Sequence, residues 1–406
     1  MKIALLHYSA PPIVGGVESV LAHHACLMAA NGHEVRLIAG RGASLADNIP
    51  LHLLPMVDSR CPEILKAKQC LDEGRLPDDW EELVALLVNE LKKALVGVDV
   101  LFAHNVCSLN KNLVLTAAIQ RILEEGAAPR LILWHHDLAW TTPRYADEYH
   151  SGYPWDLLRW HWPGAIHVVV SEMLRLELAE LTGIPASEIL VIPHGVDYKE
   201  IIKLEPRTVE FIDRLDLLKA APLFLLPVRI TPRKNIELAL CTLSHIRPTW
   251  REARLVVTGP LGPHNPANIH YFNQLIKLRS RLGLEAHAHF LAEMVQDFLP
   301  DSVIADFYRL ADAVLLPSKE EGFGIPILEA GLAGTPVFCA DIPPFRALGG
   351  SSAFYFPPNA EPSLIAAQIV RALSGSVVTR QRIHVRKNYL WEQIYSLYIS
   401  PLIEGK

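Results

Sequence analysis

The chain has 406 residues, of which 50% are hydrophobic and 20% are charged, and its formal net charge is -6. One hydrophobic core rarely serves a chain of this length, so the length predicts two domains. With 38 Lys and Arg residues against 44 Asp and Glu residues, the chain lacks the global positive field of a nucleic-acid-binding protein, and we expect no nucleic-acid partner. Any phosphate group that it binds must be held by a few local groups.

Short apolar runs alternate with helix-like segments along the first half of the chain. Such runs end at small or polar residues and are separated by segments of helical period, which predicts β-α units around a parallel sheet. Strands are expected at residues 2–6, 34–39, 98–103, 130–134, 166–170 and 189–192. Residues 1–197 are therefore predicted to be a Rossmann-like domain.

The same pattern starts again in the second half, after a charged and irregular segment at residues 198–221 that we interpret as a linker and lead-in to the second domain. Strands are expected at residues 223–228, 254–258, 287–291, 313–316 and 336–339. Residues 198–381 are predicted to form a second Rossmann-like domain, so the fold class is α/β. Ligands of such sheets bind beyond the carboxyl ends of the strands, which predicts a loop-lined cleft where the two domains face each other.

The two ends of the chain carry further signals. Residues 382–406 contain aromatic and aliphatic side chains at helical spacing, which predicts an amphipathic helix. That helix either caps the second domain or crosses back onto the first. At the other end, the apolar run at residues 1–6 is too short for a signal peptide or a membrane span. We therefore expect no transmembrane segment and a cytoplasmic location, with peripheral membrane association left open.

The most informative motif lies at residues 320–330, which read EEGFGIPILEA and follow a predicted strand of the second half. Gly322 and Gly324 allow the backbone to approach a ligand closely, and the amino end of a helix favours phosphate oxygens. Glu321 and Glu329 add two carboxylates, which suit a hydroxyl-rich ligand such as ribose or a hexose. The plain alternative is a glycine-rich turn between strand and helix with two solvated glutamates.

Two cations flank a turn after the first strand of the second half. Arg229 and Lys234 lie on either side of Pro232. Because both follow the carboxyl end of the strand, they can converge on one anion. An exposed basic turn is the alternative, but in combination with the acidic loop a diphosphate leaving group explains the pair better.

Paired glycines follow the first strand of the chain, at Gly15 and Gly16. They suit close approach of the backbone to a phosphate or a sugar, although the G-x-G-x-x-G fingerprint of dinucleotide sites is absent. A plain strand-to-helix turn is the alternative.

Paired histidines, His135 and His136, follow the strand expected at residues 130–134. A histidine there can donate a hydrogen bond to a sugar hydroxyl or to a developing phosphate charge, and a structural histidine is the alternative. We predict no metal site, because neither H-E-x-x-H nor D-x-D occurs. His194 lies in the turn at residues 193–197, which we interpret as a hinge rather than a ligand site.

Taken in order, these motifs resemble those of glycosyltransferase family 4, whose retaining enzymes have the GT-B fold, and the resemblance extends over nearly the whole chain. The matches are Gly15-Gly16, His136-Asp137, Pro193-His194-Gly195-Val196-Asp197, the pair Arg229 and Lys234, and the E-x7-E stretch from Glu321 to Glu329. The sequence departs from the family pattern at His194, where Asn is usual, and at Asn235, where Gly is usual.

The resemblance implies roles for these positions. Arg229 and Lys234 would hold the donor diphosphate, Glu329 would bind the ribose, and Glu321 would contact the transferred sugar together with backbone amides. His136 would lie near the reaction centre, unless His135 has that role. The predicted catalytic residues are His136, Glu321, Arg229 and Lys234. The predicted donor-binding residues are Gly15, Gly16, Arg229, Lys234, Glu321, Gly322, Phe323, Gly324, Ile325 and Glu329. The expected acceptor-side residues are Tyr8, His135, Trp140 and Tyr145.

The predicted activity is retaining, metal-independent transfer of a hexose from a UDP-, GDP- or ADP-sugar to a hydroxyl group. The expected acceptor is a small molecule, a glycan or a lipid-linked sugar, and no separate cofactor is expected. Two alternatives stay open: a sugar-nucleotide epimerase-like enzyme, and a nucleotide-sugar-binding subunit without catalytic activity.

Overall fold

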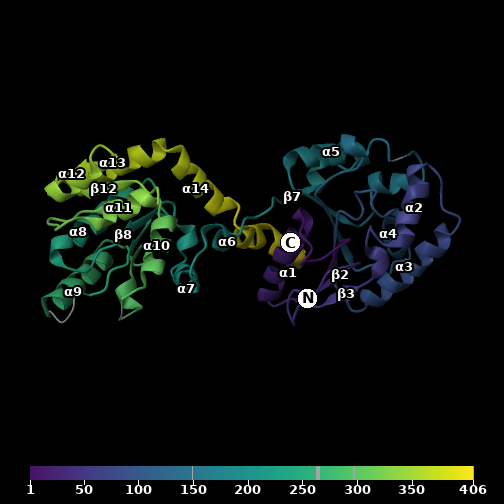
Figure 1. Cartoon of the computed structure of the whole chain (residues 1–406), viewed down its shortest axis with the longest axis horizontal. Helices are drawn as coiled ribbons and strands as arrows, with labels where there is room; N and C mark the ends of the chain where they lie inside the picture. The colour runs from purple at the N-terminus through teal and green to yellow at the C-terminus, as the bar shows by residue number, and fades with distance from the viewer. Residues whose placement is uncertain (149, 262–265, 296–297, 406) are drawn as a thin grey trace. The chain divides into compact units, whose positions relative to one another are not determined.

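The computed structural model describes residues 1–148, 150–261, 266–295 and 298–405, and the chain divides into two compact units (Figure 1). Unit 1 comprises Met1–Gly195 and Trp391–Lys406, and unit 2 comprises Val196–Leu390. The chain enters unit 2 next to the boundary expected at residues 197–198. It leaves unit 2 at Leu390, so the segment expected as a third part, 382–406, is shared between the two units.

Unit 1 is built around a seven-stranded sheet in the order β3-β2-β1-β4-β5-β6-β7, and all of its strand pairs are parallel. Along β1, Ile3 and Leu5 belong to one hydrophobic core and Ala4 and Leu6 to another, because successive side chains of a strand alternate between faces. Both faces are thus covered, which is why the strands are continuous apolar runs. The strands are β1 (Lys2–Leu6), β2 (Glu34–Ala39), β3 (Leu51–Leu53), β4 (Val100–His104), β5 (Arg130–His135), β6 (Ile166–Val169) and β7 (Leu190–Val191).

Helices cover both faces of this sheet. Three of them, α2, α3 and α4, share the core of one face, and α1 shares the other core with the C-terminal helices (Figure 1). A smaller cluster lies under α5. The helices of unit 1 are α1 (Gly16–Ala30), α2 (Pro62–Asp72), α3 (Trp80–Ala94), α4 (Leu113–Glu124), α5 (Glu172–Thr182), α15 (Trp391–Ile394) and α16 (Ser400–Glu404).

The C-terminal segment is not the single helix that the periodicity predicts. Helix α14 (Val377–Asn388) ends before Tyr389, whose carbonyl accepts a hydrogen bond of 2.7 Å from the Val196 amide, and Leu390 pairs with Val196 in a β-bridge. Helix α15 follows, and a π-helical turn, Tyr395–Ile399, leads into α16. The backbone pairing with Val196 interrupts the helix and explains the difference.

Unit 2 is built around a six-stranded sheet in the order β10-β9-β8-β11-β12-β13, again with all pairs parallel. The sheet and its helices share one continuous core. The strands are β8 (Leu223–Leu226), β9 (Arg254–Val257), β10 (Ala288–Phe290), β11 (Ala313–Leu316), β12 (Val337–Ala340) and β13 (Phe354–Phe356). The helices are α6 (Tyr198–Ile202), α7 (Pro206–Arg214), α8 (Ile236–Ile246), α9 (Pro266–Arg281), α10 (Asp301–Leu310), α11 (Ile325–Leu332), α12 (Pro343–Gly349), α13 (Pro362–Gly375) and α14 (Val377–Asn388).

The segment at residues 198–221, expected as a linker and lead-in within the second domain, is an ordered part of unit 2. It contains α6 and α7, and Tyr198, Phe211 and Ile212 are buried in the core of that unit. The Asp197 side chain caps α6 by accepting a hydrogen bond of 2.8 Å from the Lys199 amide. The charged residues that suggested a linker belong to short helices with one buried side.

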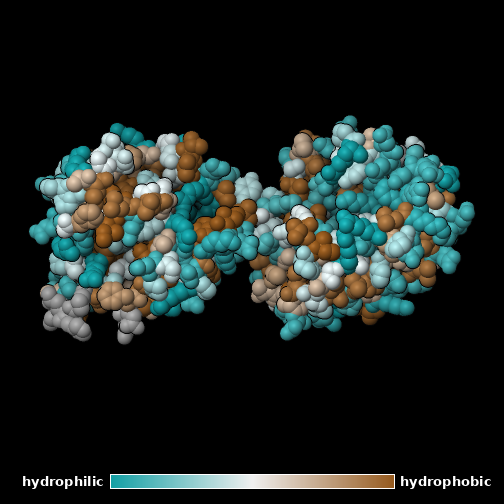
Figure 2. All heavy atoms as spheres, viewed as in Figure 1, coloured by the Kyte–Doolittle hydropathy of each residue, from teal (hydrophilic) through white to brown (hydrophobic). Residues whose placement is uncertain are grey.

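The strand order reverses next to the first strand of each sheet, where β1 lies between β2 and β4 and β8 lies between β9 and β11. In doubly wound sheets, ligands bind at the carboxyl ends of the strands at this point. The loops there contain most of the predicted site residues. The visible face of each unit combines hydrophilic residues with scattered hydrophobic patches (Figure 2). No helix in the described part of the chain is long and apolar enough to span a membrane.

Candidate active site

The loops that follow β8 and β11 meet in unit 2. The Lys234 ammonium is hydrogen-bonded to Oε1 of Glu321, and both side chains are buried, at 9% and 8% exposure. The Arg233 guanidinium lies 3.7 Å from Oε2 of Glu321, and the Arg233 carbonyl accepts a hydrogen bond of 2.8 Å from the Lys319 amide. The basic turn and the acidic loop, which the sequence presents as separate motifs, therefore form one structure.

Arg229 differs from Lys234 in that its side chain is exposed. It lies over the ring of Phe298, 5.5 Å from the ring centroid, and it forms no ion pair with any residue that the structure describes. Its charge is thus available to an anionic ligand. Asn235, where the family usually has Gly, has a φ of 55°, a left-handed conformation that Asn tolerates better than other side chains, so this departure fits the backbone.

The glycine-rich turn leads directly into α11. Gly324 precedes the helix with a φ of 102°, and a Cβ atom there would lie 3.0 Å from the ring of Phe345, so both backbone conformation and packing require glycine. A Cβ atom on Gly322 would meet nothing within 4 Å. Phe323 and Ile325 are more than half exposed, at 58% and 57%, and leave the loop open to solvent.

Glu329 lies on α11 and is exposed. Its Oε2 accepts a hydrogen bond of 2.6 Å from the Tyr308 hydroxyl, and both residues line a hollow of about 300 Å³ beside α10 and α11. Burial and the bond to Glu329 raise the pKa of the Tyr308 phenol well above its usual range, so Tyr308 stays protonated and orients the carboxylate.

In unit 1, Gly15 provides space rather than an unusual backbone conformation. Its φ of −171° is extended, but a Cβ atom there would lie 2.1 Å from a carboxylate oxygen of Glu18. The Ser9 hydroxyl donates a hydrogen bond of 2.6 Å to the same carboxylate. No atom lies within 4 Å of a Cβ placed on Gly16. Ser9 and Glu18 were not predicted from the sequence; their only signal is that they flank the glycine pair.

A chain of hydrogen-bonded histidines runs from the interior of unit 1 to its surface. Nδ1 of His104 lies 3.0 Å from Nε2 of His136, and Nδ1 of His136 lies 3.0 Å from Nε2 of His194. His104 is fully buried, His136 partly buried and His194 exposed. Burial lowers the pKa of each of the three imidazoles, so all three are neutral at pH 7.

The direction in which the hydrogen bonds of this histidine chain are donated follows from the ring at its buried end. Nε2 of His104 is buried and has no hydrogen-bond partner among the described residues. A buried N–H without an acceptor is rarer than an unused acceptor, so we assign the proton of His104 to Nδ1, which donates to His136. His136 then donates from Nδ1 to His194. The remaining N–H of His194, at Nδ1, has no hydrogen-bond partner on the residues that the structure describes and can face a ligand.

Asn105 fixes the turn that carries His136. It adopts a left-handed conformation, with a φ of 60°, directly after β4. Its Oδ1 accepts hydrogen bonds from the amides of His136, at 2.7 Å, and Asp137, at 3.3 Å. Neither Asn105 nor His104 was predicted from the sequence, although the two polar residues directly after the strand expected at residues 98–103 were the available signal.

The predicted acceptor-side residues fall into two groups. Tyr8 and His135 are each 3% exposed: the Tyr8 hydroxyl donates to the Asn105 carbonyl at 3.2 Å, and His135 is paired with His167 at 3.0 Å. Both rings are interior groups, and an acceptor can reach neither without rearrangement. Trp140 and Tyr145 are only partly buried, and each packs against an arginine side chain.

No cluster of three or more His, Cys, Asp or Glu side chains in the described ranges is arranged to hold a metal ion.

Comparisons with known proteins match both halves of the chain. The family model described as Glycosyltransferase Family 4 matches residues 14–200, and the model described as Glycosyl transferases group 1 matches residues 210–388. Mannosylglucosylglycerate synthase of Petrotoga mobilis is 25% identical over 370 residues, covering 85% of this chain and 84% of the relative. D-inositol 3-phosphate glycosyltransferase of Kineococcus radiotolerans is 31% identical over 170 residues, or 41% of this chain and 38% of the relative. Among solved structures, Anabaena HepE in complex with UDP-glucose is 18% identical, with all of both chains covered and a TM-score of 0.36.

Proposed function

This chain belongs to glycosyltransferase family 4 and has the GT-B fold, and from that premise we propose that it transfers a hexose from a nucleoside diphosphate sugar to an acceptor hydroxyl group. The transfer retains the anomeric configuration and needs no metal ion. The observation that carries this proposal is the junction of the β8 and β11 loops in unit 2, where Lys234 and Glu321 form a buried pair and the same basic turn carries the exposed Arg229.

The diphosphate of the donor is assigned to this junction. Arg229 has no competing carboxylate among the described residues, and Lys234 is held in place by Glu321. The first amides of α11 add partial positive charge next to the same loop. Cations and oriented amides stabilise the charge that develops on a departing diphosphate, so this arrangement supports departure of the leaving group without a metal.

In the proposed reaction, the bond between the anomeric carbon and the phosphate oxygen breaks as the acceptor oxygen bonds to that carbon from the same face. The acceptor proton passes to the departing phosphate oxygen, and the products are a glycoside and a nucleoside diphosphate. Glu321 is engaged by Lys234 and does not serve as a nucleophile. Its Oε2 makes only the longer contact of 3.7 Å with Arg233, which leaves it able to accept a hydrogen bond from a sugar hydroxyl.

The ribose of the donor is assigned to Glu329, whose carboxylate is exposed and oriented by Tyr308. In unit 1, the N–H at Nδ1 of His194 is assigned to the transferred sugar or to the acceptor, and His136, whose two ring nitrogens contact His104 and His194, is assigned to position His194. A neutral imidazole with a remaining N–H suits a hydroxyl group, because it can donate a hydrogen bond to the hydroxyl oxygen.

The first substrates to test follow from a relative. The name of the Petrotoga protein, a mannosylglucosylglycerate synthase, points to a mannosyl donor and glucosylglycerate as acceptor. Donors with a uridine, guanosine or adenosine base belong in the same screen.

The decisive experiment is a thermal-shift and product screen of the full chain against UDP-, GDP- and ADP-sugars, with and without EDTA. We expect one nucleotide sugar to raise the melting temperature and to be consumed, with no loss in EDTA and with a product of unchanged anomeric configuration by NMR. Arg229→Ala must abolish the shift, whereas Arg251→Ala, at another exposed arginine of unit 2, must not. No response to any sugar nucleotide would refute the transferase proposal, an inverted product would refute retention, and loss of activity in EDTA would refute metal independence.

A further inference from the structure

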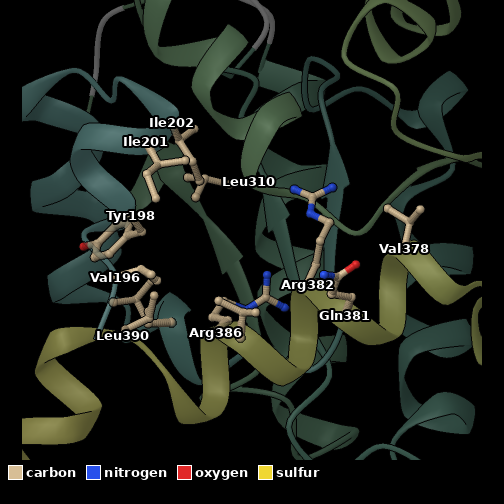
Figure 3. A pocket seen from close by; sticks show the side chains of 12 residues that line it. Val196, Tyr198, Ile201, Ile202, Leu310, Val378, Gln381, Arg382, Arg386 and Leu390 are labelled. Carbon is tan, nitrogen blue, oxygen red and sulfur yellow. The ribbon is translucent and has the colours of Figure 1, made fainter. Parts of the chain in front are cut away.

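Unit 2 contains a second hollow, of about 330 Å³, where α14 passes α6 and the end of α10 (Figure 3). None of the described residues that line it belongs to the predicted donor site. Its size falls at the lower end of the range typical of small-molecule sites in proteins.

Most of the wall is aliphatic. Leu310 and Leu390 are buried and belong to the core of unit 2, and Ile202 and Leu218 pack against that core. Two further lining residues, Ile201 and Val378, are largely exposed, at 71% and 66%. An exposed aliphatic lining that continues into the core favours the binding of an apolar chain, because burial of that chain removes apolar surface from water.

Two arginines of α14 extend into this apolar setting, and Figure 3 shows their side chains reaching toward Leu310. Arg386 is neutralised: its guanidinium lies 2.5 Å from Oδ2 of Asp312 and also donates to the Ala220 carbonyl. Arg382 is not. It donates a hydrogen bond to the Arg309 carbonyl and forms no ion pair with any carboxylate in the described part of the chain.

The surroundings of Arg382 disfavour an unpaired cation. Burial lowers the pKa of the Arg382 guanidinium; Asp312 partly offsets this effect, and the neighbouring Arg386 adds to it. A cation that loses hydration without gaining a counter-ion carries a free-energy penalty, and an incoming anion removes that penalty.

We propose that this hollow binds an aliphatic monocarboxylate, with the carboxylate on the Arg382 guanidinium and the hydrocarbon chain along Leu310, Leu390 and Ile202. A guanidinium fork matches the two oxygens of a carboxylate. The volume suits a single chain of modest length rather than a two-chain lipid. This site is separate from the donor site, and its ligand does not depend on the proposed transfer activity.

Calorimetric titration of the full chain with three probes of equal chain length, octanoate, octanol and octylammonium, tests the proposal. We expect octanoate to bind, octanol to bind about tenfold more weakly for lack of a charged hydrogen bond, and octylammonium not to bind. Arg382→Gln is expected to weaken octanoate by about tenfold and to leave octanol unchanged. Equal binding of octanoate and octanol, or an unchanged octanoate Kd in Arg382→Gln, would overturn the proposal.

A matched pair of variants keeps the test valid if Arg382→Gln fails to fold. Val378 is exposed, so Val378→Glu and Val378→Lys place opposite charges beside the hollow without disturbing the core. We expect Glu to weaken octanoate by about threefold and Lys not to weaken it. Octanoate must also slow hydrogen exchange in residues 196–202 and 378–390 and leave residues 321–329 unchanged. Identical Kd values for the two variants, or protection only at residues 321–329, would place the ligand elsewhere and refute the site.

Discussion

The loops at the carboxyl ends of the two sheets carry different chemistry, although both sheets have the same strand order around their first strand. In unit 2, the loops after β8 and β11 carry fixed charges: the buried pair Lys234 and Glu321, and the exposed Arg229. In unit 1, the end of β4, the turn after β5 and the turn that contains His194 carry neutral, hydrogen-bonded imidazoles. One scaffold thus supports two kinds of recognition.

The difference matches the two kinds of ligand group in the proposed reaction. A diphosphate needs positive charge that is present throughout, and lysine and arginine keep their charge at neutral pH. Hydroxyl groups of a sugar or an acceptor carry no charge and can be bound by neutral hydrogen-bonding groups such as imidazoles. The division predicts that changes in unit 2 act on the donor and its departure, and that changes in unit 1 act on turnover and on the response to acid.

The largest effect is expected from Lys234→Met. Loss of one group that stabilises developing charge typically lowers the rate by about 10²–10³-fold, so kcat/KM must fall by that order. The variant also leaves the Glu321 carboxylate buried without its cation, which destabilises unit 2 by roughly 3–5 kcal/mol. Activity and thermal unfolding are measured together.

The double variant Lys234→Met with Glu321→Gln separates these two effects. Removal of both charges is expected to restore much of the melting temperature, because no unpaired charge stays buried. Activity must stay low. Recovery of activity together with stability would mean that Lys234 has a structural role only.

The second-largest effect on activity is expected from a change in unit 1. His136→Asn removes the central ring of the histidine chain, and we expect kcat to fall by about 10²-fold, with the thermal shift caused by the donor nucleotide unchanged. The matched control is His194→Asn, which installs the residue usual in the family and is expected to lose less than His136→Asn. A loss of nucleotide binding in His136→Asn would contradict the division of roles between the units.

The third effect is a difference in acid stability between the units. Burial lowers the pKa of His7 to about 4 and of His24 to about 3, from 6.5, and it also lowers the pKa of His104, His136 and His194. Below pH 6.5 the unfolded chain binds protons that the folded chain does not. The stabilisation is therefore complete above that pH and is lost as the pH falls toward the lowered values.

Each of the buried histidines His7, His24 and His104 contributes a loss of up to about 1.4 kcal/mol per pH unit within this window, and the exposed His194 contributes less because solvent screens its charge. In unit 2, His287 and His289 also have lowered pKa values, the latter about 4, but the described part of that unit has no comparable cluster of histidines. Peptide-resolved hydrogen exchange at successive pH values is the measurement. Protection must decrease first in unit 1, and parallel losses in both units would contradict the comparison.

The fold was predictable wherever a strand is a continuous apolar run. Strands β1, β2 and β11 match their predicted ranges, and other predicted strands differ by a few residues at their ends. Two strands, β3 and β13, were not predicted; each has three residues and includes an exposed one. The helices within residues 198–221 were not predicted, because their exposed sides are charged and their buried residues are few and scattered.

The site was predictable as separate motifs but not as contacts. Lys234 and Glu321 are 87 positions apart, and no local pattern states that their side chains form a pair. The histidine chain depends on spacings of 32 and 58 positions, set by the order of the strands in the sheet. His194 illustrates the difference: its turn suggests a hinge, whereas its ring is the exposed end of a hydrogen-bonded chain.

The smallest effect is expected from a change at Tyr308, which supports Glu329, the predicted ribose contact. Tyr308→Phe removes the hydroxyl that donates to Glu329 at 2.6 Å. Because Glu329 is exposed, water can replace this bond, so the loss in donor binding is about 1 kcal/mol, or roughly fivefold in KM. The turnover number must stay unchanged, since the ribose lies away from the bond that breaks. Glu329→Gln is the matched variant and must raise the donor KM by more than Tyr308→Phe. A fall in kcat with an unchanged KM in Tyr308→Phe would mean that this part of unit 2 acts on the chemical step instead.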